Sequence, residues 1–547
     1  MANVKFSKKL FEKEIGKLDE KMQESISMFG TPLENITNEE IEIEIFPNRP
    51  DLFSYQGFKR SFLGFLGRKT GLKEYKINKP EKDYQVIIDS SVKDVRPYTA
   101  CAIVRGLKLD NEKIKELIEI QEKLHLTIGR KRKKAAIGIY PLEKIKLPIS
   151  FRAMEPDQIK FIPLESDREM SGLQILQRHP TGRDYAHLLA GKSKFPIFVD
   201  SESNILSMPP IINSRLTGKI TGETKDVFIE CSGFDFNILK RCLNILVTSL
   251  AEMGGEIYSM EIKGAPEKVS PNLETEKIKI NLENTNKTLG LKLDEKQLKN
   301  LIEKMGHNYN KGIVEIASWR TDILHEIDLI EEVAIAYGYE KLIPEMPKIS
   351  TIGNENPKEI IKRKISEILS GLNMLEVSNY HLTNKNDQFM KMGISEKQEK
   401  GIIELESSKT DYTILRNNLS HFLLKNLSEN VDSEYPQRIY ETGIVFELKE
   451  DIKETEKLAI AVTPGNFTEA RQILEYLFKN IGSQIIFEET ENFPVHFIEG
   501  RTAKIILNKK EIGFIGEIHP KILRNWKIKM PVALLEINLE EIFKILQ

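Results

Sequence analysis

Residues 319–342 read WRTDILHEIDLIEEVAIAYGYEKL, a segment in which apolar residues recur at steps of three and four. That spacing predicts an amphipathic helix. The apolar positions are Leu324, Ile327, Ile330, Val333, Ala334 and Tyr337. Asp322 precedes the pattern as a candidate N-cap and Gly338 follows it as a stop signal. We therefore expect a helix that begins near Leu324 and ends at Tyr337.

The polar face of this predicted helix is acidic. Asp328, Glu331 and Glu332 stand at positions i, i+3 and i+4, so their carboxylates share one face of the helix. Like charges this close require either good solvation or a cation that neutralises them. A well-solvated acidic face explains the residues without any metal. If a cation is bound, carboxylate oxygens favour magnesium or calcium.

Length and composition limit the classes of protein that the sequence can belong to. With 547 residues, the chain is expected to form roughly three to five domains. Its 40% hydrophobic and 30% charged residues are typical of a soluble protein. A net charge of −2 argues against general coating of nucleic acid, so any RNA contact must come from local basic patches.

Cysteine usage and hydropathy indicate the cellular setting. Cys101, Cys231 and Cys242 form no CxxC pair, which disfavours a disulfide framework and a zinc ribbon. The first residues alternate charged with apolar side chains, unlike a signal peptide. No segment approaches the roughly 18 apolar residues of a membrane span. We expect a cytoplasmic protein without membrane contact.

Residues 41–67, IEIEIFPNRPDLFSYQGFKRSFLGFLG, contain the second informative motif. Their first six residues alternate apolar with acidic side chains, which predicts a half-buried strand. Asp51 is a candidate cap for a helix whose buried face carries Phe58, Phe62 and Phe65. Without further information, the Asn-Arg-Pro-Asp segment is interpreted as a strand–turn–helix corner.

Residues 86–265 mix strands and helices in an order that favours an α+β fold. A basic run, Arg130 to Lys134, precedes a predicted strand and is either a solvated loop or a phosphate-tracking patch. Residues 203–233, SNILSMPPIINSRLTGKITGETKDVFIECSG, crowd small polar side chains around a Pro-Pro bend and a glycine turn. Such loops often bind ligands, although turn chemistry alone explains the composition.

The acidic segment resembles the B5 domain of the phenylalanyl-tRNA synthetase β subunit, and the Asn-Arg-Pro-Asp corner resembles its B1 domain. The resemblance implies a Mg²⁺ ion near the partner subunit, held at the matching Asp322, Asp328, Glu331 and Glu332. Two motifs of one family in the same order are more specific than either motif alone.

Residues 86–265 resemble the B3/B4 editing domain of the archaeal and eukaryal type of this β subunit, which hydrolyses tyrosine wrongly attached to tRNA. The resemblance implies an editing pocket lined by Ser207, Asn213, Arg215 and Glu230. No Ser-His-Asp or metal arrangement is evident in this segment. We therefore expect the terminal ribose hydroxyl of the substrate to activate water.

Residues 355–547 resemble the B6/B7 region, a relative of the antiparallel catalytic sheet of class II synthetases. The segment Arg438-Ile-Tyr-Glu441 is similar to the Arg-x-Glu that holds ATP in that class. Ile518, however, stands where an active site of that class needs an arginine, so one clamp on the γ-phosphate is missing. We expect a catalytically silent scaffold that packs on the α subunit.

The resemblance implies an α+β multidomain fold in four parts: a B1-like domain at 1–80, an editing domain at 86–265, a winged-helix-like B5 domain at 277–345, and the class II-like domain at 355–547. It also implies the β subunit of a phenylalanine–tRNA ligase, with tRNA(Phe) and an α subunit as partners in an α2β2 heterotetramer. The alternatives are a free-standing deacylase of mischarged tRNA and a non-catalytic RNA-binding module. P-loop, GxGxxG and HExxH motifs are absent, which disfavours nucleotide hydrolases, dehydrogenases and metalloproteases.

Overall fold

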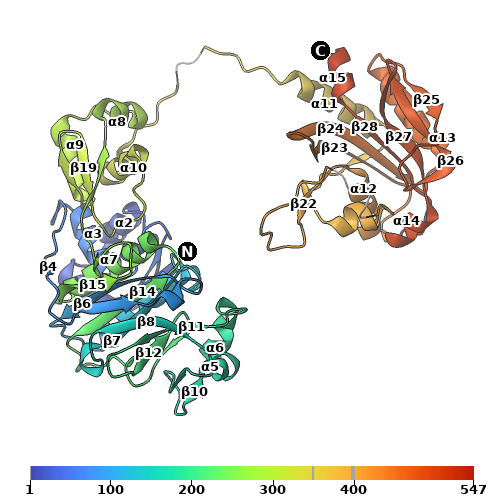
Figure 1. Cartoon of the computed structure of the whole chain (residues 1–547). Helices are drawn as coiled ribbons and strands as arrows, with labels where there is room; N and C mark the ends of the chain where they lie inside the picture. Colours follow the sequence, from blue (N-terminus) through green and yellow to red (C-terminus); the bar gives the residue numbers. More distant parts are fainter. Residues whose placement is uncertain (1, 348–349, 396–400, 547) are drawn as a thin grey trace. The chain divides into compact units, whose positions relative to one another are not determined.

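The computed structural model describes residues 2–347, 350–395 and 401–546. The chain divides into two compact units, Met1–Met346 and Pro347–Gln547 (Figure 1). Each unit has its own hydrophobic clusters. Helices and strands are mixed in both units, so a multidomain α/β fold is confirmed. In the described ranges, none of the helices has the length and apolar character needed to cross a membrane.

The first unit begins with a three-stranded antiparallel sheet in the order β1-β3-β2. Inward and outward residues alternate along β3, as its alternating sequence predicts. Phe58, Phe62 and Phe65 of α3 pack against Phe29, which confirms the expected aromatic face of that helix. The elements are β1 (Ala2–Ser7), α1 (Lys8–Glu14), α2 (Glu20–Met28), β2 (Leu33–Ile36), β3 (Glu40–Ile45) and α3 (Tyr55–Phe65).

An 11-stranded mixed sheet forms the centre of this unit. Its path runs β13-β12-β11-β8-β5-β15-β6-β14-β7, with β4 and β16 paired to β15. The long helix α7 buries its apolar face against β6 and β14. The strands are β4 (Ile77–Asn78), β5 (Gln85–Ile88), β6 (Tyr98–Arg105), β7 (Ala135–Pro141), β8 (Ile149–Met154), β11 (Phe195–Val199), β12 (Ile205–Met208), β13 (Ile212–Asn213), β14 (Val227–Gly233), β15 (Glu256–Lys263) and β16 (Val269–Ser270); the helices are α4 (Asn111–Leu126), α5 (Gly172–Arg178), α6 (Pro180–Tyr185) and α7 (Phe236–Glu252).

The last part of the first unit joins a small sheet, β17-β19-β18, to three helices. The predicted capping box of Asp294 and Gln297 is present at the start of α9. This part packs on α3, where a side chain at Gly64 would place its Cβ 2.8 Å from the Lys304 carbonyl oxygen. The elements are β17 (Glu276–Lys279), α8 (Leu282–Leu289), α9 (Glu295–Lys304), β18 (Asn308–Asn310), β19 (Ile313–Ile316) and α10 (Glu326–Tyr337).

The second unit is built on a seven-stranded sheet in the order β20-β23-β24-β28-β27-β26-β25, antiparallel except at β20. One face packs against α11, α13 and α15, and the other against α12 and α14. The elements are α11 (Pro357–Gly371), β20 (Leu375–Glu376), α12 (Ser420–Glu429), β23 (Gln437–Leu448), β24 (Ile452–Thr463), α13 (Phe467–Asn480), β25 (Ile486–Glu489), β26 (Phe497–Leu507), β27 (Lys510–Ile518), α14 (Pro520–Asn525), β28 (Ala533–Asn538) and α15 (Glu540–Leu546).

Two predicted helix caps are wrong. Ser54, not Asp51, caps α3, because Asp51 lies in a preceding 3-10 turn. His325, not Asp322, is the N-cap residue of α10, which begins two residues later than expected. Gly338 ends α10 as predicted, with a positive φ of 101°. The division of the first unit into three domains remains a prediction.

Candidate functional site

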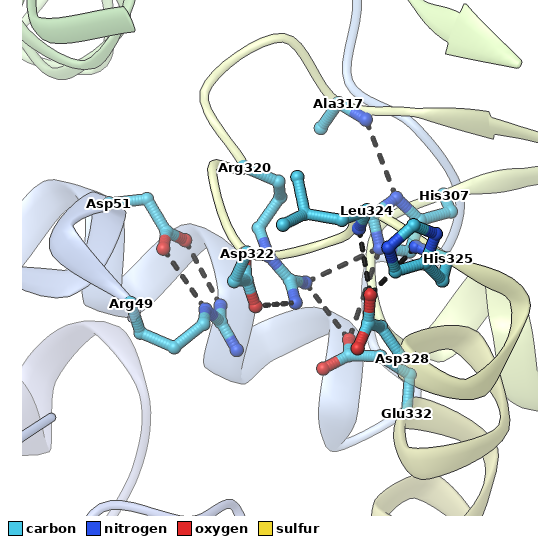
Figure 2. Close-up of polar contacts among 10 residues, drawn as sticks. All are labelled: Arg49, Asp51, His307, Ala317, Arg320, Asp322, Leu324, His325, Asp328 and Glu332. Atoms are coloured by element: carbon cyan, nitrogen blue, oxygen red, sulfur yellow. Dashed lines mark hydrogen bonds and ion pairs between the residues drawn. The ribbon is translucent and has the colours of Figure 1, made fainter. Parts of the chain in front are cut away.

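The side chain of Asp328 stabilises the N-terminal end of the acidic helix α10. One carboxylate oxygen of Asp328 accepts hydrogen bonds from the backbone N–H groups of Leu324 and His325, both at 2.8 Å (Figure 2). A carboxylate in the first turn also interacts favourably with the helix dipole. Leu324 and Ile327, which the apolar pattern placed on the buried face, are more than half exposed. Ile330, Val333 and Ala334 are buried as predicted, and Leu329 and Ala336 are buried beside them.

Arg320 neutralises two of the four predicted metal ligands. Its Nε and Nη2 donate to the two carboxylate oxygens of Asp322 at 2.8 and 2.7 Å, and its Nη1 donates to Glu332 at 2.9 Å (Figure 2). Burial, the largest single influence, opposes ionisation of Asp322, but the charge and hydrogen bonds of Arg320 together with the charge of Arg49 outweigh it and lower the Asp322 pKa. Asp322 does not cap the helix, because it lies four residues before Glu326, where α10 begins, and its oxygens bind Arg320.

The four acidic residues do not surround one point. Glu331 is exposed and forms no hydrogen bond or ion pair within the described residues. Throughout the part of the chain that the structure describes, no group of three or more His, Cys, Asp or Glu side chains could hold a metal ion. The four residues therefore do not fit a complete magnesium shell supplied by this chain alone.

The two motifs found in the sequence meet in space. Arg49 donates hydrogen bonds from Nε and Nη2 to the two carboxylate oxygens of Asp51, both at 3.0 Å, in the same bidentate geometry that joins Arg320 to Asp322. The two pairs lie side by side (Figure 2), and the charge of Arg49 also lowers the pKa of Asp322. The Asn-Arg-Pro-Asp corner thus completes a buried charge network around the start of α10.

A pocket of about 470 Å³ lies at the edge strands of the large sheet. Ser207, Asn213 and Glu230, from β12, β13 and β14, line it together. Ser207 and Asn213 are direct cross-strand partners. Arg215, predicted to join them, lies outside: it is exposed, forms an ion pair with Asp167 and donates a hydrogen bond to the Ser166 carbonyl.

Two polar atoms of this pocket are buried without a partner. Within the described residues, neither Ser207 Oγ nor Glu230 Oε2 has a hydrogen-bond partner. The other oxygen of Glu230 accepts a hydrogen bond from the Tyr140 hydroxyl at 3.2 Å. Burial raises the pKa of the Glu230 carboxyl to about 8, and the charge of Arg96 offsets part of that effect. Unpaired buried polar atoms are rare in folded proteins, and they mark a position that a ligand can occupy.

Sequence reasoning missed Tyr140 and Gly138, which flank Glu230. Gly138 is the cross-strand partner of Glu230, and a Cβ at this position would lie 2.6 Å from Glu230 Oε1 and would collide with the Tyr140 hydroxyl. Gly138 and Tyr140 stand two apart on one strand, so they share a face. The sequence shows that Gly138 and Tyr140 are two residues apart, but only the structure shows that Gly138 is the cross-strand partner of Glu230.

The basic run before β7 contributes one residue to the pocket. Arg132 lines it, donates to the Ile211 carbonyl at 2.8 Å and to Glu122 at 3.0 Å, and stacks on the Tyr185 ring. His125 also lines the pocket, but its Nε2 accepts a hydrogen bond from the backbone N–H of Ile137 at 2.8 Å. His125 is therefore engaged in holding α4 on β7. The phosphate-tracking role of the basic run remains a prediction.

In the second unit, the segment similar to an ATP-binding Arg-x-Glu makes internal pairs. Arg438 binds Glu469 at 2.8 Å, while Glu441 forms a buried pair with Arg416 at 2.6 Å. Ile518 is buried in the hydrophobic cluster below the sheet. Arg438 Nε has no hydrogen-bond partner within the described residues, and the catalytically silent scaffold remains a prediction.

Models of two protein families match parts of the chain. The description "Phenylalanyl tRNA synthetase beta chain CLM domain" matches residues 343–539, and "tRNA synthetase B5 domain" matches residues 278–339. The second match contains the acidic helix and its Arg320 network.

Relatives cover nearly the whole chain. A phenylalanine–tRNA ligase β subunit of Pyrococcus abyssi is 40% identical over 510 residues, which are 91% of this chain and 90% of the relative. That of Archaeoglobus fulgidus is 38% identical over 527 residues, 95% of this chain and 94% of the relative. A crystal structure of an N-terminal fragment of the phenylalanyl-tRNA synthetase β subunit from Pyrococcus horikoshii matches with a TM-score of 0.59 and 37% identity, covering 61% of this chain and 99% of the fragment.

Proposed function

Since this chain belongs to the family of phenylalanine–tRNA ligase β subunits, we propose that it acts with an α subunit in an α2β2 heterotetramer on tRNA(Phe). In this proposal the α subunit joins phenylalanine to the tRNA and cleaves ATP to AMP and pyrophosphate. The second unit supports this division of work, because Glu441 is already paired with Arg416 in the interior of the unit. This chain then contributes the scaffold and a separate hydrolytic site.

The hydrolytic site is the pocket around Glu230, and its substrate is tyrosine wrongly attached to tRNA(Phe). The observation that carries this proposal is the pair of unpartnered buried atoms, Glu230 Oε2 and Ser207 Oγ. A pocket built for phenylalanine rejects tyrosine by only about 10²-fold, because the analogue merely adds a hydroxyl. A second pocket that hydrogen-bonds the phenolic hydroxyl selects in the opposite direction, since phenylalanine would leave its buried polar atoms unpaired.

Glu230 is the residue suited to recognise the phenolic hydroxyl. Its Oε2 lacks a partner while its Oε1 is held by Tyr140, so the carboxyl is fixed in direction. Gly138 leaves the space beside it that a side chain would fill. A tyrosine hydroxyl placed at Oε2 would satisfy the buried carboxyl, whereas a phenylalanine ring edge would not.

Hydrolysis then depends on positioning rather than on a catalytic triad. The pocket's histidine, His125, is engaged with the backbone of Ile137, which removes an obvious general base. We assign to Asn213 and Ser207, at the neighbouring β12–β13 pair, the positioning of the ester and of a water that the terminal ribose hydroxyl activates. Arg215 lies outside the pocket, so its predicted role there is not part of this mechanism.

The test is hydrolysis of Tyr-tRNA(Phe) by the complex of this chain with its α subunit. Asn213→Ala and Glu230→Ala are expected to slow deacylation by about 10-fold or more, the equivalent of one lost hydrogen bond to a charged or buried group. Asn35→Ala, at an exposed position of β2, is the matched control and should leave the rate unchanged. Undiminished deacylation by both pocket variants would remove the pocket from the reaction.

Purification separates this function from the alternatives. Equal amounts of α subunit and of this chain in one stable particle support the heterotetramer. A lone chain that hydrolyses Tyr-tRNA would instead indicate a free-standing deacylase. Activation of phenylalanine with ATP by this chain alone would overturn the proposed division of work.

We also propose a Mg²⁺ site that this chain supplies only in part. Asp328 keeps one oxygen outside its bonds to the backbone, and Glu331 is exposed three residues later. These two carboxylates are suited to hold a hard cation, with the remaining oxygens coming from the partner subunit and water. In this proposal Asp322 and Glu332 do not bind the cation directly, because their ion pairs with Arg320 hold them in place.

A further inference from the structure

A second pocket of the first unit, about 320 Å³ in volume, lies between α3, the loop that follows it and the segment before α10. Its wall carries Lys59, Arg60, Lys69, Lys73 and Arg320 against a single acidic residue, Glu252. It shares no residue with the pocket around Glu230. A cleft lined by one sign of charge concentrates ligands of the opposite sign.

Partners within the chain neutralise part of this basic wall. Lys73 binds Glu252 at 2.6 Å, and Lys59 binds a glutamate of α1 at 2.9 Å. Arg320 is held by its own two carboxylates. Lys69 is exposed and forms no side-chain bond within the described residues. Arg60 and Lys69 therefore have no carboxylate in direct contact, and Glu252 acts on Arg60 only from beyond the Tyr75 hydroxyl that links them.

Arg60 is held in place but only partly satisfied. Its guanidinium carbon lies 4.1 Å from the centroid of the Trp319 ring, and its Nη1 donates to the Tyr75 hydroxyl at 3.0 Å. Its Nε and Nη2 are buried and have no acceptor in the described part of the chain. Leaving buried N–H groups of a charged side chain unpaired is costly.

Nε and Nη2 form the edge of a guanidinium that binds an oxyanion with two parallel hydrogen bonds. Arg49 offers this edge to Asp51, and Arg320 offers it to Asp322. Arg60 presents the same edge with no carboxylate opposite. Three arginines in one region thus share a geometry, and one of them still lacks its oxyanion.

We propose that Arg60 and Lys69 bind a phosphate group in this pocket. Because protein atoms cover Arg60 Nε and Nη2 in this structure, the side chain must shift into the pocket before a phosphate can offer two oxygens to this edge and a third to Lys69, which lines the same pocket. A single carboxylate could satisfy only the arginine. Glu252 does not repel it strongly, because Lys73 and Tyr75 already neutralise and bind that carboxylate. The phosphate is either a free inorganic ion or one phosphate of an RNA backbone.

Calorimetric titration of the full-length chain with inorganic phosphate tests the site. Arg60→Gln should weaken phosphate binding by about 10-fold or more, and Lys69→Gln by about threefold. Arg60→Lys keeps the charge but removes the two-pronged edge, so its affinity should fall between wild type and Arg60→Gln. Lys160→Gln, at an exposed position of the short strand β9 (Lys160–Phe161), which belongs to a separate two-stranded sheet, removes the same charge and should bind as wild type does.

Equal phosphate affinity in wild type, Arg60→Lys and Lys69→Gln would overturn the proposal, as would the absence of binding to the wild type. If Arg60→Gln does not fold, Arg60→Lys and Lys69→Gln still test the proposal, since Lys69 is exposed and its substitution should not affect folding. Filter binding of tRNA then identifies the source of the phosphate. If Arg60→Lys binds tRNA more weakly, and if added phosphate weakens tRNA binding by the wild type in the same way, the site binds an RNA phosphate. If Arg60→Lys binds phosphate more weakly but tRNA as well as the wild type does, the site binds a free ion.

Discussion

The charge network at the start of α10 and the pocket around Glu230 are both buried and polar, yet they differ in one respect. In the network, each carboxylate of Asp322 and Glu332 meets Arg320, and Asp328 meets two backbone N–H groups. In the pocket, Glu230 Oε2 and Ser207 Oγ have no hydrogen-bond partner within the described residues. Satisfied polar groups stabilise a structure, whereas an unsatisfied buried atom is costly and is available to a ligand or a water. The acidic segment, conspicuous in the sequence, is thus the more structural of the two.

Removing the central cation of the network should have the largest effect. Arg320→Met leaves the largely buried carboxylates of Asp322 and Glu332 without their guanidinium partner, which is expected to cost about 3–5 kcal/mol of unfolding free energy. Urea unfolding followed by Trp319 fluorescence in a Trp526→Phe background measures it, since these are the two tryptophans of the chain. Adding Asp322→Asn and Glu332→Gln should recover much of the loss. A stability unchanged by Arg320→Met would show that the network is not structural.

Titration of Glu230 gives the next effect. Its pKa is raised to about 8 in the fold, so the native state holds a proton that the unfolded chain releases near its ordinary value. The stabilisation is therefore fully present below about pH 4.5 and is lost as the pH rises through about 8. Between about pH 5 and pH 8 the unfolding free energy of the wild type should fall by about 3–4 kcal/mol relative to Glu230→Gln. A difference independent of pH would place Glu230 in a solvated site.

Removing the Tyr140 hydroxyl should have a smaller effect, and it distinguishes the hydrogen bond to Glu230 from the packing of the Tyr140 ring. Tyr140→Phe keeps the ring but removes the donor to Glu230, so Tyr-tRNA hydrolysis should slow by about 10-fold, or about 1.4 kcal/mol. Its matched control is Tyr185→Phe, whose ring stacks on Arg132 and needs no hydroxyl to do so. Equal rates in both variants would mean that Tyr140 does not orient the carboxyl.

Magnesium should have the smallest effect. Mg²⁺ at about five times its Kd would stabilise the complex with the α subunit by about 1 kcal/mol, and Asp328→Asn with Glu331→Gln should abolish that gain. Melting temperature with and without EDTA measures it. If chelation changes neither melting nor assembly, the exposed part of this acidic face is only solvated charge.

Local patterns predicted most of the elements because they depend on near neighbours. The alternation of β3, the Asp294–Gln297 capping box and the stop at Gly338 were all correct. The caps at Asp51 and Asp322 were wrong, because each aspartate is taken by an arginine two residues earlier. Resemblance supplied Ser207, Asn213 and Glu230, and the structure brings them into one pocket without Arg215.

The sequence by itself determined the family, the mixed α/β character and the positions of most helices and strands, since periodicity and capping act over a few residues. Only the tertiary structure decided which charged groups are paired. Gly138 faces Glu230 across two strands that are distant in the chain, and the Arg49 corner meets Arg320 from another part of the sequence. Pairing across such distances depends on how the sheets and helices pack, and packing also decides which buried oxygen is left for a ligand.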